Sequence, residues 1–199
     1  MIPPTMKVMD NNIAIDISES MLIEDCEPTR IEMVKKGVDK FLERRNSCNF
    51  GIILFAASAW KYSEPAAGKC YSTAKILPPG GEAGGTAIGE AVFLAANQGG
   101  PTSQVRRLIL ISDGDNTIGS VSPALAAEIA LNHNLTISCI GVGQEGPVKF
   151  GKDALGRSVF VSDTFSDTSL KFLASKTNGH YYRAKNSEEV AKILWDLLN

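Results

Sequence analysis

The chain of 199 residues is 44% hydrophobic and 21% charged, a composition typical of one globular domain with a substantial core. Its formal net charge of -2 gives no electrostatic reason to expect nucleic-acid binding. No window approaches the roughly 18 consecutive apolar residues of a membrane span, so this segment is not expected to insert into a bilayer. Four scattered cysteines favour neither a disulfide scaffold nor a paired-cysteine metal site; Cys139 is expected to be buried, and pairing among the other three stays open.

The first half of the chain alternates between strand-like and helix-like segments. A strand is predicted over 12–17 and a helix over 29–45, whose apolar residues recur on one helical face. Thr29 and Glu32 form a capping box at the start of that helix. A second apolar strand over 50–57 is followed by 58–65, which alternates more and is expected to pair back on it as a short antiparallel edge.

The second half continues the alternation. It contains a predicted Gly/Pro-rich loop, helices and strands, in this order: loop 77–85, helix 86–98, strand 106–113, helix 122–134 beginning at Ser122 and Pro123, strand 135–143, an irregular stretch, helix 166–179 closed by Gly179, strand 180–184 and helix 187–199.

Apolar strands that alternate with amphipathic helices predict an α/β fold: a doubly wound, mostly parallel central sheet with helices on both faces. We expect about six strands, one of them a short antiparallel edge strand. No internal repeat or long linker indicates a second domain, so 1–199 is expected to form a single domain, with 1–10 as a flexible lead-in.

Oxygen-bearing side chains follow the strands of this predicted sheet. Asp16 and Asp113 end two strands, Ser18 and Ser20 follow the first at alternate positions, and Thr86 ends the glycine-rich loop. Sites in such sheets lie at the carboxyl ends of strands, so these five residues are expected at one edge. In an extended exit from the strand, alternate residues point the same way and could face one ion. Hard oxygen donors suit Mg²⁺, with Mn²⁺ or Ca²⁺ as alternatives.

The charge of this set indicates what the ion does. Two carboxylates balance a divalent cation and the hydroxyls are neutral, so the site carries no excess negative charge. Mg²⁺ also keeps waters readily, which leaves an exposed coordination position that an acidic side chain of a protein partner can take. Taken singly, the serines, Thr86 and Asp113 are also typical of turns and helix caps. Only their coincidence at the strand ends favours a metal site.

An enzyme of the haloacid-dehalogenase type is the main alternative, because it too begins with a strand that ends in a Mg²⁺-binding aspartate. Such a phosphoryl-transfer enzyme needs an acidic residue two positions later as acid/base, and this chain has Ser18 there. No catalytic residue is therefore predicted and the chain is not expected to be an enzyme. A structural scaffold with a vestigial metal site is the other alternative.

Three glycine-rich or acidic motifs do not support a nucleotide or calcium site. GVGQEG (141–146) is followed by Pro147 and no helix is predicted there, so a dinucleotide would lack a helix N-terminus. GGEAGGT (80–86) lacks the lysine of a P-loop. DGDNTIGS has Ile118 where a calcium loop needs glycine, and Ala124 in place of the closing glutamate.

Three segments resemble the loops of the von Willebrand factor A domain, which carry its metal-ion-dependent adhesion site (MIDAS). DISESM resembles the DxSxS motif of the first loop, GGTAIGEA the second loop and LILISDGDN the third, and the similarity extends over 10–199. The resemblance implies that Ser18, Ser20 and Thr86 contact the ion directly, while Asp16 and Asp113 act through water.

Within this superfamily the chain is similar to the bacterial Bat-type proteins, notably in DISESMLIEDCEPTRIEMVKKGVDKFLERR and LASKTNGHYYRAKNSEEVAKI. That likeness implies a parent protein anchored in the bacterial inner membrane and partners among other Bat-type proteins or MoxR-type AAA+ ATPases, with a role in tolerance of oxidative stress.

Two features depart from the family pattern. Glu19 stands where these domains usually carry glycine, and it is expected either to change cation or partner binding or to point to solvent. The segment 64–81 differs from the helix that usually follows the edge strand.

Overall fold

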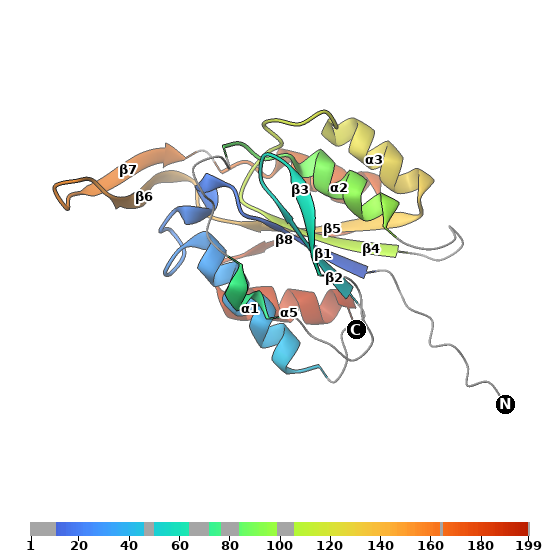
Figure 1. Ribbon diagram of the computed structural model, residues 1–199, viewed down its shortest axis with the longest axis horizontal. Coiled ribbons are helices and arrows are strands. Elements are labelled where there is room, and N and C mark those ends of the chain that lie inside the picture. Colours follow the sequence, from blue (N-terminus) through green and yellow to red (C-terminus); the bar gives the residue numbers. More distant parts are fainter. Residues whose placement is uncertain are drawn as a thin grey trace.

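The structure, a computed structural model, describes residues 11–45, 50–63, 72–76, 84–98, 106–163 and 165–198. A six-stranded sheet in the order β3-β2-β1-β4-β5-β8 forms its centre (Figure 1). The strands are β1 (Asn11–Asp16), β2 (Phe50–Phe55), β3 (Ala59–Ser63), β4 (Arg106–Ser112), β5 (Leu135–Val142) and β8 (Tyr181–Ala184). All neighbours are parallel except β2 and β3, which confirms the predicted sheet and its antiparallel edge strand.

Helices cover both faces of this sheet, as predicted. Helices α1 (Arg30–Glu43) and α5 (Ser187–Leu198) lie on one face, and α2 (Ile88–Asn97) and α3 (Pro123–Asn132) lie on the other (Figure 1). Helix α4 (Thr168–Lys176) packs beside α3 and against β5. Alternate residues of each central strand enter two separate cores, one under each helical layer. The strands therefore read as continuous apolar runs, because both of their faces are buried.

Helix starts follow the capping residues of the sequence. The Thr29 side chain accepts a hydrogen bond from the Glu32 backbone N–H at 3.3 Å, and Ser122 caps α3 by accepting from the Leu125 N–H at 3.3 Å. Pro123 occupies the first position of α3, where its missing N–H would have no helical partner. These caps satisfy otherwise unpaired backbone donors and place the helix boundaries within a few residues of the predicted ones.

The stretch between β5 and α4 is not irregular, so that prediction was wrong. It forms a separate antiparallel hairpin of β6 (Gly146–Lys152) and β7 (Ser158–Asp163). The signal in β6 is weak because glycine and proline are depleted in strands, and a register shift between Lys149 and Lys152 contains Gly151 at φ 69°. GVGQEG leads into this hairpin and no helix follows it, as predicted.

The end of α4 also differs from the prediction. Asn178, at φ 58°, takes the left-handed conformation expected of Gly179. Gly179 is needed for space instead, since a Cβ there would lie 1.9 Å from the Ile137 carbonyl oxygen of β5.

We expect Gly179→Ala to lower the free energy of unfolding by about 1–3 kcal/mol or more, because the backbone of β5 would have to move. Urea denaturation measures the loss. Gly84→Ala is the matched control, since a Cβ there meets nothing within 4 Å. Equal stability of the two variants would contradict this account of Gly179.

Some predictions fall outside the described residues: the lead-in 1–10, most of the loop 77–85, most of the segment 64–81, and Cys48 and Cys70. Cys139 is fully buried, as predicted, and burial raises the pKa of its thiol. Cys26 is likewise a buried free thiol.

Candidate metal site

The predicted site residues lie where β1 and β4 end at the same edge of the sheet. These strands are parallel neighbours, so Asp16, the last residue of β1, comes close to Asp113, which follows β4 directly. Directly after β1, the Ile17 N–H donates a hydrogen bond to the Phe55 carbonyl of β2 at 2.8 Å. The parallel arrangement thus brings together loops that are far apart in sequence.

The exit from β1 stays extended only as far as Ser18 and then turns tightly, which corrects the prediction of an extended exit through Ser20. Glu19–Leu22 form a short 3-10 helix, and the fully buried Met21 holds it against the core. The two serine hydroxyls still meet, since Ser18 Oγ lies 3.1 Å from Ser20 Oγ. Ser18 precedes the turn, yet its side chain makes no cap hydrogen bond, so the turn does not account for its hydroxyl.

Direct hydrogen bonds join the first loop to the third. The Ser18 N–H donates to Asp16 Oδ1 at 2.8 Å, and the Ser20 hydroxyl donates to Asp113 Oδ1 at 3.0 Å. The hydroxyl of Ser112, which is not among the predicted site residues, donates to Asp16 Oδ2 at 2.6 Å. Four of the five predicted residues therefore form one connected cluster.

Backbone hydrogen bonds hold Thr86 at the same edge of the sheet. The Thr86 N–H donates to Thr117 Oγ1 at 2.8 Å and its carbonyl accepts from the Thr117 N–H at 2.9 Å. The Ala87 N–H donates to the Ala56 carbonyl at 2.7 Å. Thr86 is buried between the loops that follow β2 and β4, and the N-cap of α2 is Ala87. Capping of α2 therefore does not explain the threonine.

Two buried carboxylates give this cluster its electrostatic character. Asp16 is fully buried and Asp113 is 3% exposed. Burial and, next, the negative charge of Asp113 raise the pKa of Asp16 to about 7, although hydrogen bonds from Ser112 and Ser18 oppose that rise. A cation placed among these oxygens would favour the charged form of both groups.

Arg30 is not among the predicted site residues, yet it lies directly behind the cluster. Its fully buried guanidinium donates from Nη1 to Asp113 Oδ2 at 2.7 Å. It also makes a bidentate ion pair with Asp25, from Nε to Oδ1 at 2.9 Å and from Nη2 to Oδ2 at 2.7 Å. An arginine at the start of an amphipathic helix is usually solvent-exposed. The available signal was its position in the first turn of α1, where the helix dipole favours acidic residues.

Asp25 neutralises the charge of Arg30, so the charge balance predicted for the metal site is kept. Burial would raise the pKa of Asp25, but the hydrogen bonds and charge of Arg30 outweigh it and hold the pKa below its usual value. Hydrogen bonds to Asp25 and the charge of Asp113 likewise outweigh burial and raise the pKa of Arg30. Since Arg30 and Asp25 neutralise each other, Asp16 and Asp113 remain to balance a divalent cation.

The donor set fits a hard cation. In the part of the chain that the structure describes, no group of three or more His, Cys, Asp or Glu side chains could hold an ion, so a site here depends on serine and threonine hydroxyls as well. Carboxylate and hydroxyl oxygens suit Mg²⁺, Mn²⁺ or Ca²⁺.

Glu19 is exposed, in line with the expectation that it points to solvent. Among the described residues no helix is long and apolar enough to cross a bilayer.

Comparison with known proteins adds a family and a group of relatives. The von Willebrand factor type A domain family matches residues 12–116, just over half of the chain. A UPF0353 protein of Mycolicibacterium paratuberculosis is 29% identical over 195 residues, which cover 90% of this chain and 57% of that protein. One from Nocardia farcinica is 27% identical over 199 residues and is covered to 59%. The chain thus spans less than two thirds of the length of these relatives.

Solved structures show the same fold. BatB of Bacteroides thetaiotaomicron matches with a TM-score of 0.75 and 28% identity, covering 96% of this chain and 97% of that one. An aerotolerance-related membrane protein of Bacteroides fragilis gives 0.74 and 28%, covering 94% and 97%. Proximal thread matrix protein 1 of the mussel byssus, whose MIDAS motif is occupied by zinc, gives 0.61 and 23%, covering 96% and 45%; at that identity it supports the fold alone.

Proposed function

Because the chain belongs to the von Willebrand factor type A domain family, we propose that it is a protein–protein interaction domain that depends on a divalent cation and is not an enzyme. In this proposal the cation is held by Asp16, Ser18, Ser20, Thr86 and Asp113, and it binds an acidic residue of a protein partner.

The observation that carries the proposal is the hydrogen bond from Ser20 to Asp113, between loops 93 residues apart in the sequence. It brings hydroxyls and two buried carboxylates together at the edge of the sheet. Burying two like charges side by side is costly, and a divalent cation would offset that cost. Mg²⁺ keeps several waters when it binds, so when bound it would supply a positive position that a further carboxylate can enter.

Phosphoryl transfer is not favoured by the same geometry. Asp16 lacks an acidic residue two positions later, and the Ser18 hydroxyl at that position contacts Ser20. A serine cannot donate a proton to a leaving group as a carboxylic acid does. Hydrolysis of small phosphate esters that Asp16→Asn abolishes would instead support an enzyme of this type.

The relatives suggest the biological setting. BatB and the aerotolerance-related membrane protein are aligned along nearly all of their solved chains, which supports a parent protein of the Bat type. We therefore place this domain, 1–199, in a parent anchored in the bacterial inner membrane. The partner is an acidic surface of another Bat-type protein or of a MoxR-type ATPase.

A pull-down with purified Bat-type and MoxR-type proteins of the same bacterium tests partner binding. We expect the wild-type domain to retain a partner in Mg²⁺ and to lose it in EDTA, and Asp16→Ala to lose it in both. Glu128→Ala is the matched control, because it removes an exposed carboxylate on α3. Equal retention in EDTA and Mg²⁺ would contradict a cation-mediated contact.

A further inference from the structure

The β6–β7 hairpin projects from the body of the molecule as a separate two-stranded sheet (Figure 1). Its base is held to the loop after β1. The Glu24 N–H donates to the Lys149 carbonyl at 2.8 Å, the two side chains form an ion pair, and the Gln144 N–H donates to Asp25 Oδ2 at 2.7 Å. An isolated two-stranded sheet is only marginally stable in water, so pairing with a further strand would stabilise a projecting hairpin.

The two outer edges of this hairpin differ in how they are protected. On β6, Pro147 has no N–H to donate, the Lys149 carbonyl already accepts from Glu24, and Lys152 adds an exposed charge. On β7, residues 158–162 contain neither proline nor a charged side chain, and among the described residues no strand other than β6 pairs with it. Only the β7 edge lacks the features that normally prevent strand addition.

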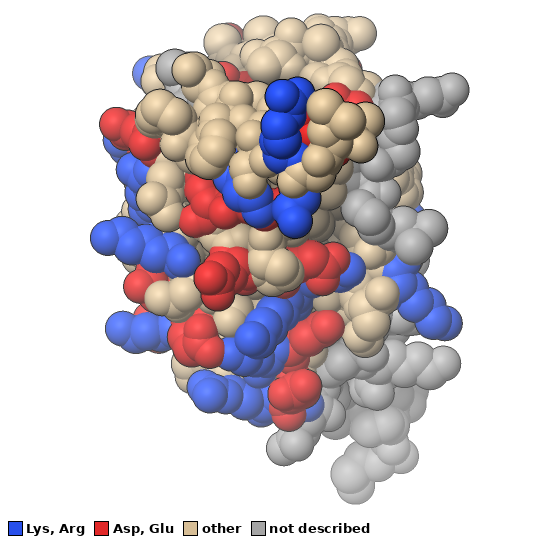
Figure 2. Space-filling model, turned by 90° about the vertical axis from the view of Figure 1, so that its left-hand side faces the viewer, with Lys and Arg blue, Asp and Glu red and all other residues tan. Residues whose placement is uncertain are grey.

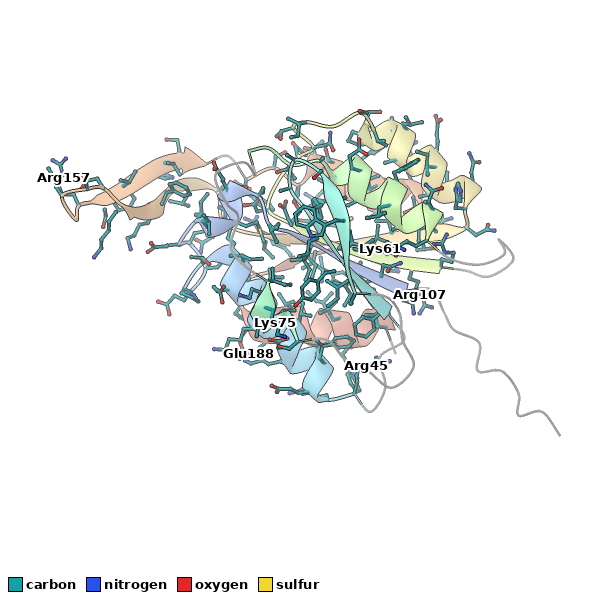
Figure 3. All side chains as sticks on the ribbon, in the orientation of Figure 1. Arg45, Lys61, Lys75, Arg107, Arg157 and Glu188 are labelled. Carbon is teal, nitrogen blue, oxygen red and sulfur yellow. The ribbon has the colours of Figure 1, made fainter. Side chains whose placement is uncertain are left out.

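The β7 sequence is symmetric about Phe160. Residues 158–162 read Ser-Val-Phe-Val-Ser in either direction. If two copies pair antiparallel about a twofold axis at Phe160, each Phe160 lies opposite its equivalent and Val159 lies opposite Val161. The flanking positions 157 and 163 are arginine and aspartate, so opposite charges would meet at both ends of this register. In the single chain the exposed Arg157 side chain pairs with Asp153 of the same hairpin at 2.7 Å, a contact that pairing with a second copy would have to replace. Arg157 lies near the hairpin tip (Figure 3).

We propose that β7 pairs edge to edge and antiparallel with β7 of a second copy of this chain, centred on Phe160. Phe160 is 65% exposed in the single chain, although large apolar side chains are usually buried. The pairing would create an aromatic cross-strand contact and a four-stranded sheet from two hairpins. Figure 2 views the molecule from the side of the hairpin: acidic and basic side chains are interspersed there, so no large field of one sign opposes a second copy.

Sedimentation velocity over a concentration series tests this pairing. The interface is small, so we expect a weak dimer that forms at high micromolar concentration. Phe160→Lys would place two ammonium groups opposite each other at the axis and abolish the dimer. Leu155→Lys is the matched control: Leu155 is 76% exposed at the hairpin tip but lies outside the paired register. It should leave the dimer unchanged, as should EDTA, because the pairing does not involve the metal site.

A charge exchange tests the register itself. Arg157→Asp alone should weaken the dimer, and the double variant Arg157→Asp/Asp163→Arg should restore it. A small interface is expected to give a weak dimer that is nevertheless populated at about 1 mM protein. A wild-type chain that is still monomeric at this concentration would overturn the proposal. So would a dimer that survives Phe160→Lys, that Leu155→Lys also removes, or that the double variant fails to restore.

Discussion

Replacing Arg30 with methionine is expected to lower the free energy of unfolding by about 3–5 kcal/mol, the usual loss when one partner of a buried ion pair is removed. The side chains of Asp25 and Asp113 are only 4% and 2% exposed. Without the guanidinium, both carboxylates would stay buried and lose the cation that now contacts them. Methionine keeps much of the length of the side chain, so loss of packing contributes less than loss of charge.

Urea denaturation at neutral pH measures this effect. Arg44→Met is the matched control, because Arg44 is exposed at the end of the same helix and its removal should change stability by no more than about 0.5 kcal/mol. The double variant Arg30→Met/Asp25→Ala should lose less than the sum of its single variants, since Asp25 then no longer remains buried without its partner. If Arg30→Met is as stable as Arg44→Met, the guanidinium does not hold the site together.

Mg²⁺ binding is expected to weaken by more than about 100-fold when Thr86, a direct ligand in the proposed site, is replaced by alanine, and by about 10–100-fold when Asp16, which acts through water, is replaced by alanine. Loss of outer-shell partners alone costs about 10–100-fold in metal affinity, and a direct ligand should cost at least as much. Isothermal titration calorimetry measures the affinity. For the wild type at 100 times its dissociation constant, Mg²⁺ should raise the free energy of unfolding by about 2.7 kcal/mol. At the same Mg²⁺ concentration this gain should fall to about 0.4 kcal/mol or less in Thr86→Ala and to about 0.4–1.4 kcal/mol in Asp16→Ala.

Thr86→Ser is the matched control for this experiment, because it keeps the hydroxyl and removes only a methyl group; it should retain Mg²⁺ binding. Absence of any binding heat or stabilisation in the wild type would favour the alternative of a scaffold with a vestigial site. Binding in Asp16→Ala or Thr86→Ala as strong as in the wild type would show that the ion, if bound, lies elsewhere.

Much of the fold could be predicted from local patterns. The runs that became β1, β2, β4 and β5 are apolar on both faces, which marks parallel strands covered by helices. Thr29 and Ser122 indicated two helix starts, because a hydroxyl at that position satisfies a free N–H of the first turn. These features depend on residues within one turn or one strand, so they can be recognised without knowing what packs against them.

The hairpin could not be predicted in the same way. Its first strand carries Gly146, Pro147 and Gly151, all unfavourable for a strand. It forms because a register shift accommodates Gly151 and because the loop after β1 pairs with Lys149. That loop lies more than 120 residues earlier, at Glu24. Its contribution is a long-range contact that no window of the sequence contains.

The sequence by itself determined the order of the helices and of the strands of the central sheet, though not the β6–β7 hairpin, and it determined the residue types at the candidate site. Hydrophobic periodicity, capping and turn chemistry act over a few residues, so they can be recognised locally. The sequence also placed Asp16 and Asp113 at the ends of strands. Only the tertiary structure decided that β1 and β4 are neighbours, so that Ser20 reaches Asp113, and that Arg30 lies buried behind them with Asp25. The reason is physical: the environment of a charged side chain is set by burial and by partners from distant segments, and neither is a property of the local sequence.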